Sequence, residues 1–319
     1  MQWLQKYTGF FRRLKPLYVL NNLLHYQQLK HNKALYKQYS IDKSVVSSIS
    51  AKDFKNSIDD MPWLDQSITT TQQIELKLQN TNFSDEIKQQ IIHWKDNGFM
   101  IIEQFFNRDL VDRLNNEIEQ LIHEKKINTN YTNKKYFNVF NQSNIAKSFI
   151  FDERLISILN FILGKEVQLF QSINFIKGSE QKPHSDAVHM STFPSNYLIA
   201  VWIALEDIEF EAGPISYYPK SHLLPNIITE DFTSIHSFLL DDNANEKYEA
   251  KIQSLLDKNQ IQAKTFLAKK GDIFIWHSKL VHAGLPILHP TLTRKSMVLH
   301  FFAKDVICYH EISQRPAIF

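Results

Sequence analysis

Cysteine is almost missing from this chain, and several other features are missing with it. Cys308 is the one cysteine among 319 residues, so no disulfide framework can form within the chain, which favours a reducing compartment such as the cytoplasm. No apolar run reaches the ~20 residues that a membrane-spanning helix needs. Basic residues from Lys6 onward interrupt the first apolar stretch, so we expect no secretory signal peptide. Without a glycine-rich phosphate loop, an internal repeat or a low-complexity tract, we predict no nucleic-acid partner.

Acidic residues are also missing from the start of the chain. Residues 1–41 contain seven lysines and arginines and neither Asp nor Glu, so this segment carries +7 in a chain of net charge +2. Apolar residues from Trp3 to Leu14 recur at steps of three and four, which predicts an amphipathic helix that Pro16 interrupts. Two interpretations stay open. The arm could contact an anionic membrane peripherally or hold a lipid-like substrate, or it could dock on the rest of the protein or on a second subunit.

The remaining sequence predicts one mainly β domain with flanking helices. We place residues 1–80 in the arm and its linker, and residues 81–319 in the domain. From Val167 onward the pattern changes to short strands rich in β-branched and aromatic residues, which is typical of a double-stranded β-helix, the jelly roll of cupin-like proteins. An insertion at 223–264, with a helix over 245–256, interrupts the strands. Expected helices are 84–97, 109–126 and 154–163, and expected strands are 98–106, 167–177, 183–190, 197–206, 214–218, 273–277, 280–283 and 295–303.

A histidine and an aspartate two residues apart are the first candidates for chemistry. On a β-strand, His184 and Asp186 would point to the same face and could fill two neighbouring positions on a metal ion. A distant second histidine would complete a two-histidine, one-carboxylate triad, which leaves the rest of an iron(II) ion open to a cosubstrate and oxygen. His282 is the preferred third ligand. The alternatives, for which we expect packing or surface roles, are His277, His289 and His300.

A basic residue follows the second histidine at the start of another strand-like run. Arg294 could pair there with the far carboxylate of a dicarboxylic acid bound at the metal. Arginine suits this role better than lysine, because its planar fork can hold both carboxylate oxygens. Lys295 is the alternative. Ser296 is two residues beyond Arg294 and would share its face of the strand.

Further motifs stand in a fixed order around these residues. They are Asp96-Asn97-Gly98-Phe99, Ala200-Val201-Trp202-Ile203, Ala212-Gly213-Pro214, Pro219-Lys220-Ser221-His222, Leu280-Val281-His282-Ala283-Gly284 and Arg294-Lys295. Together with the triplet His184-Ser185-Asp186, they resemble the phytanoyl-CoA dioxygenase family of iron(II)- and 2-oxoglutarate-dependent oxygenases. The resemblance covers roughly Ser84 to Phe302, and the order and spacing of all the motifs make it specific.

The resemblance implies a site and an activity. The implied contacts are His184, Asp186 and His282 for iron(II), and Arg294, Ser296, Gln171, Asn174 and Trp202 for the cosubstrate 2-oxoglutarate. O2 is the second cosubstrate. A related group of halogenases lacks the carboxylate ligand, so its presence as Asp186 favours hydroxylation or a related oxidation. We therefore predict a dioxygenase that hydroxylates an unactivated C–H bond of a small-molecule or lipid-like substrate.

The identity of the substrate stays open at this stage. The residues after the triplet, His189 to Phe193, and those at Phe232 to Leu240 are expected to face it. The alternative function is a catalytically silent jelly roll used for binding, or one that holds zinc. Zinc uses the same ligand types, but it would give Arg294 no role.

Overall fold

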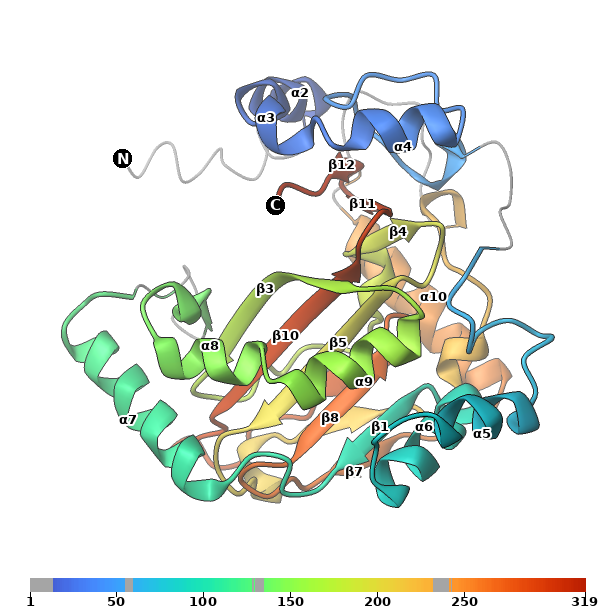
Figure 1. Ribbon diagram of the computed structural model, residues 1–319. Helices are drawn as coiled ribbons and strands as arrows, with labels where there is room; N and C mark the ends of the chain where they lie inside the picture. Colours follow the sequence, from blue (N-terminus) through green and yellow to red (C-terminus); the bar gives the residue numbers. More distant parts are fainter. Residues whose placement is uncertain (1–13, 55–59, 128, 130–134, 232–240, 242) are drawn as a thin grey trace.

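An antiparallel six-stranded sheet runs through the middle of the protein (Figure 1). The structure, a computed structural model, describes residues 14–54, 60–127, 129, 135–231, 241 and 243–319. The order of the large sheet is β1-β8-β5-β10-β3-β2, and two three-stranded sheets have the orders β7-β6-β9 and β12-β11-β4. The strands are β1 (Phe99–Ile102), β2 (Lys135–Phe137), β3 (Val167–Phe175), β4 (Ser191–Phe193), β5 (Leu198–Ala204), β6 (Ile215–Tyr217), β7 (Lys264–Phe266), β8 (Ile273–His277), β9 (His282–Gly284), β10 (Ser296–Ala303), β11 (Ile307–His310) and β12 (Arg315–Pro316).

The large sheet has two buried faces, and successive residues of β10 point to opposite ones, as strand geometry requires. Met297 and Leu299 belong to the cluster under the flanking helices. Val298, between them, belongs to a second cluster that includes Trp202 of β5 and Tyr217 of the β7-β6-β9 sheet. The large sheet and the β7-β6-β9 sheet therefore enclose a common interior. The mainly β prediction with flanking helices is confirmed.

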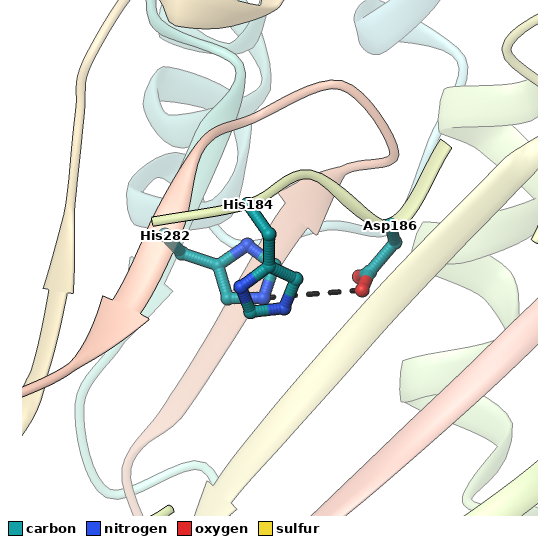
Figure 2. Close-up of side chains that lie close together, drawn as sticks. All are labelled: His184, Asp186 and His282. Atoms are coloured by element: carbon teal, nitrogen blue, oxygen red, sulfur yellow. Dashed lines mark ion pairs between the residues drawn. The ribbon is translucent and has the colours of Figure 1, made fainter. Parts of the chain in front are cut away.

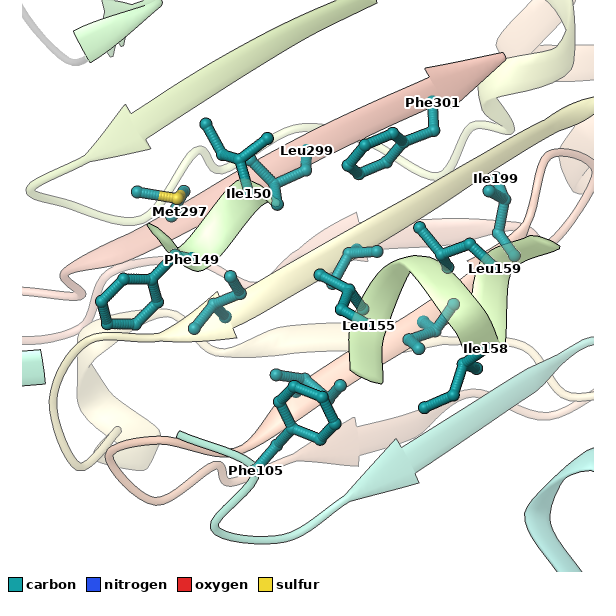
Figure 3. Close-up of a cluster of buried hydrophobic side chains, with 14 of the residues drawn as sticks. Phe105, Phe149, Ile150, Leu155, Ile158, Leu159, Ile199, Met297, Leu299 and Phe301 are labelled. Carbon is teal, nitrogen blue, oxygen red and sulfur yellow. The ribbon is translucent and has the colours of Figure 1, made fainter. Parts of the chain in front are cut away.

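Two helices cover the outer face of the large sheet (Figure 3). They are α8 (Asn144–Ile150) and α9 (Glu153–Leu163). Leu155, Ile158 and Leu159 of α9 are fully buried in the cluster that they share with β5 and β10. Full burial of one such side chain stabilises the fold by about 1.5–3 kcal/mol. The two helices therefore stabilise the sheet whose other face lines the interior.

Helix ends follow the capping residues of the sequence. The Ser84 hydroxyl accepts a hydrogen bond from the Ile87 amide at the start of α6 (Asp85–Asn97), and Gly98 ends that helix with φ 76°. A β-carbon at Gly98 would collide with the ring of His222, so glycine is required there by packing as well as by backbone conformation. The other described α-helices of the chain are α2 (Lys15–Leu24), α3 (Tyr26–Leu29), α4 (Asn32–Gln38), α5 (Thr71–Gln79), α7 (Arg108–His123) and α10 (Ala244–Lys258).

The described part of the N-terminal arm lies against the sheet that contains the C-terminal strands β11 and β12 (Figure 1). Leu29 and Tyr36 of the arm are buried in one cluster with Ile307 and Tyr309 of β11. This part of the arm is therefore docked on its own chain. The predicted stripe from Trp3 to Phe11 lies outside the described residues. Across the described ranges, the helices are all too short or too polar to cross a membrane.

The linker and the insertion both contribute to the core. Leu64 and Ile74 of the linker belong to the cluster on the outer face of the large sheet, and the predicted boundary at residue 80 stays a prediction. In the insertion, the Tyr248 hydroxyl of α10 lies 2.9 Å from the Ser185 amide nitrogen, which donates to it. Helix α10 therefore supports the segment that carries His184 and Asp186 from behind.

That segment does not form the strand predicted over 183–190. His184 makes a single antiparallel bridge to His282, and the chain then turns into a 3-10 helix, Asp186–Val188. The ladder stops because the next pairing position, Leu280, lies in the turn between β8 and β9, where its amide donates to the His277 carbonyl at 2.8 Å. The prediction of a strand over 183–190 was wrong. Nothing in the sequence of 183–190 indicates that Leu280, the residue it would pair with, lies in a turn.

Candidate active site

His184, Asp186 and His282 lie together in the interior between the sheets (Figure 2). The backbone bridge between the two histidines sets their ring centroids 4.4 Å apart. Asp186 faces both rings from the start of the 3-10 helix, with its Oδ1 3.9 Å from Nε2 of His282. One ligand atom from each residue lies within 4.8 Å of the others, and all three residues are buried. Together they form a candidate site for a metal ion.

The hydrogen bonds of the two rings aim the correct nitrogens at this site. Nδ1 of His184 lies 2.8 Å from the Lys182 carbonyl, and Nδ1 of His282 lies 3.0 Å from the Leu280 carbonyl. A carbonyl only accepts, so each Nδ1 carries the proton and each Nε2 keeps a lone pair for a metal. Histidine ligands in proteins commonly use their second nitrogen in this way. In this structure, Nε2 of His184 accepts a hydrogen bond from the side-chain amide nitrogen of Gln181 at 3.0 Å.

The charges of the three residues also suit a divalent cation. Burial lowers the pKa of His184 to about 3, so its ring is neutral at pH 7. Burial alone would raise the pKa of Asp186, but the rings of His282 and His300 outweigh it and hold that pKa well below its usual range. Two imidazoles and one carboxylate are the donor set of the facial-triad iron(II) sites. The residues present therefore fit iron(II).

Two residues that the sequence analysis did not assign to the site touch Asp186. The indole nitrogen of Trp276 donates to Oδ2 of Asp186 at 2.8 Å. Nε2 of His300 lies 3.7 Å from the same oxygen, and its Nδ1 lies 3.2 Å from the amide nitrogen of Gln171. The expectation that His300 has only a packing or surface role misses this contact. His300 lies four residues after Ser296 on β10, and this even spacing, which places both side chains on one face, is the signal that could have found it.

The other two alternative histidines lie elsewhere. His277 is buried, and its Nε2 lies 3.0 Å from Oδ2 of Asp65 in the linker. His289 is exposed and its ring contacts the Thr291 hydroxyl at 2.9 Å. Neither belongs to the candidate metal group formed by the described residues.

A cavity of about 290 Å³ adjoins the three ligands, and Arg294 lines it. The Arg294 side chain is buried, with only 2% of the residue exposed. It donates to the Gly213 carbonyl at 3.2 Å, its Nε has no partner, and no described carboxylate lies within 4.0 Å. Burial lowers its pKa to about 10, which still leaves it charged at pH 7. A buried charge of this kind is costly without a counter-charge, so the cavity is suited to an anion.

The remaining predicted cosubstrate residues divide between the two faces of the sheet. Gln171 and Trp202 line the same cavity as Arg294, and the indole nitrogen of Trp202 is buried without a partner. Ser296 is fully buried, and its hydroxyl has no hydrogen-bond partner. Asn174 lies on the opposite face of β3, beside a small separate cavity. We therefore do not place Asn174 in the candidate cosubstrate site.

Lys295, the alternative to Arg294, also faces that other side. Its ammonium group lies 2.6 Å from a carboxylate oxygen of Glu119 on α7, and its backbone amide donates to Glu206. The two residues precede β10 and line different cavities, Arg294 the one at the candidate metal ligands and Lys295 the small separate one. Of the pair, Arg294 is the residue that lines the interior cavity.

The chain belongs to the phytanoyl-CoA dioxygenase family, whose sequence model matches residues 94–295. The resemblance seen in the motifs is thereby confirmed. A curated relative from Dictyostelium discoideum, named phytanoyl-CoA dioxygenase domain-containing protein 1 homolog, is 30% identical to this chain over 131 residues. That match covers 40% of this chain and 42% of the relative, so it spans less than half of the relative's length.

Solved structures of similar shape support the fold. The carbocyclase SnoK from nogalamycin biosynthesis superposes with a TM-score of 0.57 at 15% identity, covering 76% of this chain and 90% of SnoK. EctD from S. alaskensis, in a structure with 2-oxoglutarate and 5-hydroxyectoine, gives a TM-score of 0.53 at 21% identity, covering 70% of this chain and 78% of EctD. The predicted double-stranded β-helix fold is confirmed.

Proposed function

We propose that the protein is an iron(II)- and 2-oxoglutarate-dependent dioxygenase that hydroxylates an unactivated C–H bond of a small-molecule or lipid-like substrate. The observation that carries this proposal is the shared cavity. It contains a buried triad of metal-ligand type and, on its wall, the buried cation Arg294 without a carboxylate partner among the described residues. Family membership supports the same conclusion. A silent or zinc-binding jelly roll would leave Arg294 without a role.

The side chains have distinct tasks in this proposal. Iron(II), with 2-oxoglutarate and O2, would supply the oxidising chemistry. His184, Asp186 and His282 would hold the metal, and Trp276 fixes the orientation of the carboxylate through its hydrogen bond to Oδ2. Arg294 would pair with the far carboxylate of 2-oxoglutarate, because a bidentate, charge-assisted pair satisfies its buried charge.

The walls of the cavity support an organic substrate. Apolar side chains of β3, of β10 and of the segment before β4 line it beside the candidate ligands; they are Ile173, Phe175, Val298 and Met190. Such walls exclude water from the reacting centre and align a carbon chain or ring by contact. The EctD structure contains a small organic molecule together with 2-oxoglutarate, which shows what this fold can accommodate and supports a small-molecule substrate here.

Peripheral membrane contact through the arm is a further part of the proposal. On α2, the leucine side chains are turned away from the protein while Asn22 is buried, donating to the Val46 carbonyl at 2.9 Å. Leu20 is 57% exposed and Leu24 is 79% exposed. This apolar row, within a segment that carries +7, suits the surface of an anionic bilayer. The protein would then be cytoplasmic and bind membrane reversibly.

An anaerobic titration tests the enzymatic proposal. Iron(II) followed by 2-oxoglutarate should produce a weak visible charge-transfer band, and admission of O2 should release succinate. His184→Ala and His282→Ala should abolish both signals and leave the circular dichroism spectrum unchanged. His289→Ala is the matched control, because it removes an exposed histidine outside the site. A wild-type protein that binds iron(II) but shows neither the band nor succinate would favour the zinc-binding or silent alternative.

A further inference from the structure

A second cavity adjoins the metal-site cavity on the side of the N-terminal arm. Its volume is about 380 Å³, and it shares Gln171, His189 and Met190 with the first. Helix α2 forms one wall, and the C-terminal strands β11 and β12 form another. These segments come from distant parts of the chain, and in Figure 1 they lie above the large sheet. We call this space the arm chamber.

His189 stands between the two cavities. Its ring centroid lies 6.2 Å from that of His184 at the metal site and 5.4 Å from that of His310 in the arm chamber. His189 follows the ligand Asp186 by one helical turn, because its amide donates to the Asp186 carbonyl at 2.9 Å. A ligand that fills the arm chamber can therefore reach the metal site by passing one side chain.

Two groups in the arm chamber offer hydrogen-bond donors that no described acceptor uses. The Ser313 amide donates to Nδ1 of His310 at 3.1 Å, so the proton of that ring is on Nε2. Nε of Arg315 donates to the Ser313 hydroxyl at 2.9 Å, which leaves both terminal nitrogens of its guanidinium free. No described carboxylate lies within 4.0 Å of Arg315. Among the described residues, the chamber thus has one formal positive charge and no anion to match it.

Arg315 is exposed, and the arm contacts its guanidinium group. The guanidinium carbon of Arg315 lies 4.7 Å from the ring centroid of Tyr18 on α2, a cation-π distance. The rest of the lining is mostly apolar. It includes Phe170, Met190, Phe302, Pro316, Ala317 and Ile318. The chamber is therefore a mainly apolar space with an exposed cation beside the arm.

We propose that the substrate is an organic anion with an apolar body. Its carboxylate or phosphate group is bound by Arg315 and His310, its body lies along Phe170 and Phe302, and its reacting carbon extends past His189 to the metal. This inference rests on the proposed function, and it assigns the arm a part in substrate recognition. The charge-assisted pairing selects the anion, and the length of the apolar body selects which carbon is oxidised.

Isothermal titration with three matched probes tests the inference. Decanoate, decyl phosphate and decanol share one apolar body, and each is titrated into the full chain with 2-oxoglutarate present so that Arg294 is occupied. We expect at least one of the two anions to bind about tenfold more tightly than decanol, since a hydrogen bond to a charged group has that magnitude. The comparison of the carboxylate with the phosphate identifies the head group.

Three variants locate the selective group. Arg315→Gln should remove the preference for the anion, Arg315→Lys should keep most of it, and Arg113→Gln, at an exposed arginine of α7, should not change it. The inference is overturned if the wild type binds none of the probes or does not prefer an anion, or if Arg315→Gln keeps the preference. Each of these results is read without turnover. The charge-transfer band with iron(II) and 2-oxoglutarate, measured on the same sample, shows separately whether the proposed function holds.

Discussion

The indole nitrogen of Trp276 donates a hydrogen bond to Oδ2 of Asp186 at 2.8 Å. The same ring lies 4.7 Å from the ring of His282, measured between centroids. One side chain of β8 therefore contacts two of the three candidate ligands. It leaves Oδ1 of Asp186 facing Nε2 of His282, so a metal would meet a carboxylate that is already oriented.

Replacing Trp276 with Phe should weaken iron(II) binding by about 10- to 100-fold, the usual effect of removing a hydrogen-bond partner of a metal ligand. The phenyl ring keeps most of the packing, but Oδ2 of Asp186 loses its donor. Anaerobic iron(II) titration measures the change. Trp94→Phe is the control, because Trp94 is equally buried in the outer cluster and lies outside the site. Equal affinities in Trp276→Phe and the wild type would show that the hydrogen bond does not position the ligand.

Arg294→Ala should raise the concentration of 2-oxoglutarate needed for half-maximal turnover by at least tenfold and leave iron(II) affinity unchanged. The change removes a charge-assisted pair worth about 1.5–3 kcal/mol, and Arg294 contacts no ligand of the metal. The dependence of succinate release on 2-oxoglutarate measures it. Lys295→Ala is the matched control, since Lys295 pairs with Glu119 on the other face. If Lys295→Ala raised the required 2-oxoglutarate concentration more than Arg294→Ala does, Lys295 would be the residue that binds the far carboxylate.

The three candidate metal ligands could be predicted from the sequence because the motif fixes two of them. His184 and Asp186 are neighbours in sequence, and the spacing of later motifs selects His282. Trp276 and His300 could not be assigned in the same way. Their contacts with Asp186 depend on how β8 and β10 both pair with β5, and a single sequence does not specify which strands are neighbours.

The fold shows the same limit at its edges. Long amphipathic helices such as α7 and α9 were predictable from periodicity alone. The short strands β11 and β12 were not, because their few residues carry no clear alternation and they become strands by pairing with each other and with β4. These two strands carry His310 and Arg315, so the arm chamber could not be foreseen either.

Asp65→Asn should lower the free energy of unfolding at pH 7 by about 1.5–3 kcal/mol, the range for a hydrogen bond to a charged group. Burial alone would raise the pKa of Asp65, but His277 and Asn196 outweigh it and hold that pKa below 3.8, its ordinary value. A lowered carboxyl pKa stabilises the fold above the unfolded value, and the contribution is lost as pH falls through the folded value.

The difference between Asp65→Asn and the wild type should therefore be constant at neutral pH and shrink below pH 3.8. Urea unfolding at a series of pH values measures it. Asp85→Asn, at an exposed carboxylate in the first turn of α6, is the control. If the difference in unfolding free energy between Asp65→Asn and the wild type did not change with pH, the charge of the Asp65 carboxylate would not be the source of the stabilisation.

The arm offers the last test, and its design follows from the docking of α3 and α4. Deleting residues 1–41 would remove Leu29 and Tyr36 from their cluster with β11, and any loss of membrane binding would then be ambiguous. Two surface changes on α2, Leu20→Ser and Leu24→Ser, avoid this problem because both side chains are exposed.

The double variant Leu20→Ser/Leu24→Ser should co-sediment with anionic vesicles less than the wild type does, by tenfold or more, because about 1.5–3 kcal/mol of apolar burial is lost for each leucine that enters the bilayer fully. The wild type should prefer anionic to neutral vesicles, and salt should weaken that preference, since each basic residue near the surface contributes about 1 kcal/mol. Leu76→Ser, at an exposed leucine of α5, is the control. Equal binding to both lipids, or binding that the double variant retains in full, would leave α2 without a membrane role and limit the arm to its contacts with the C-terminal strands.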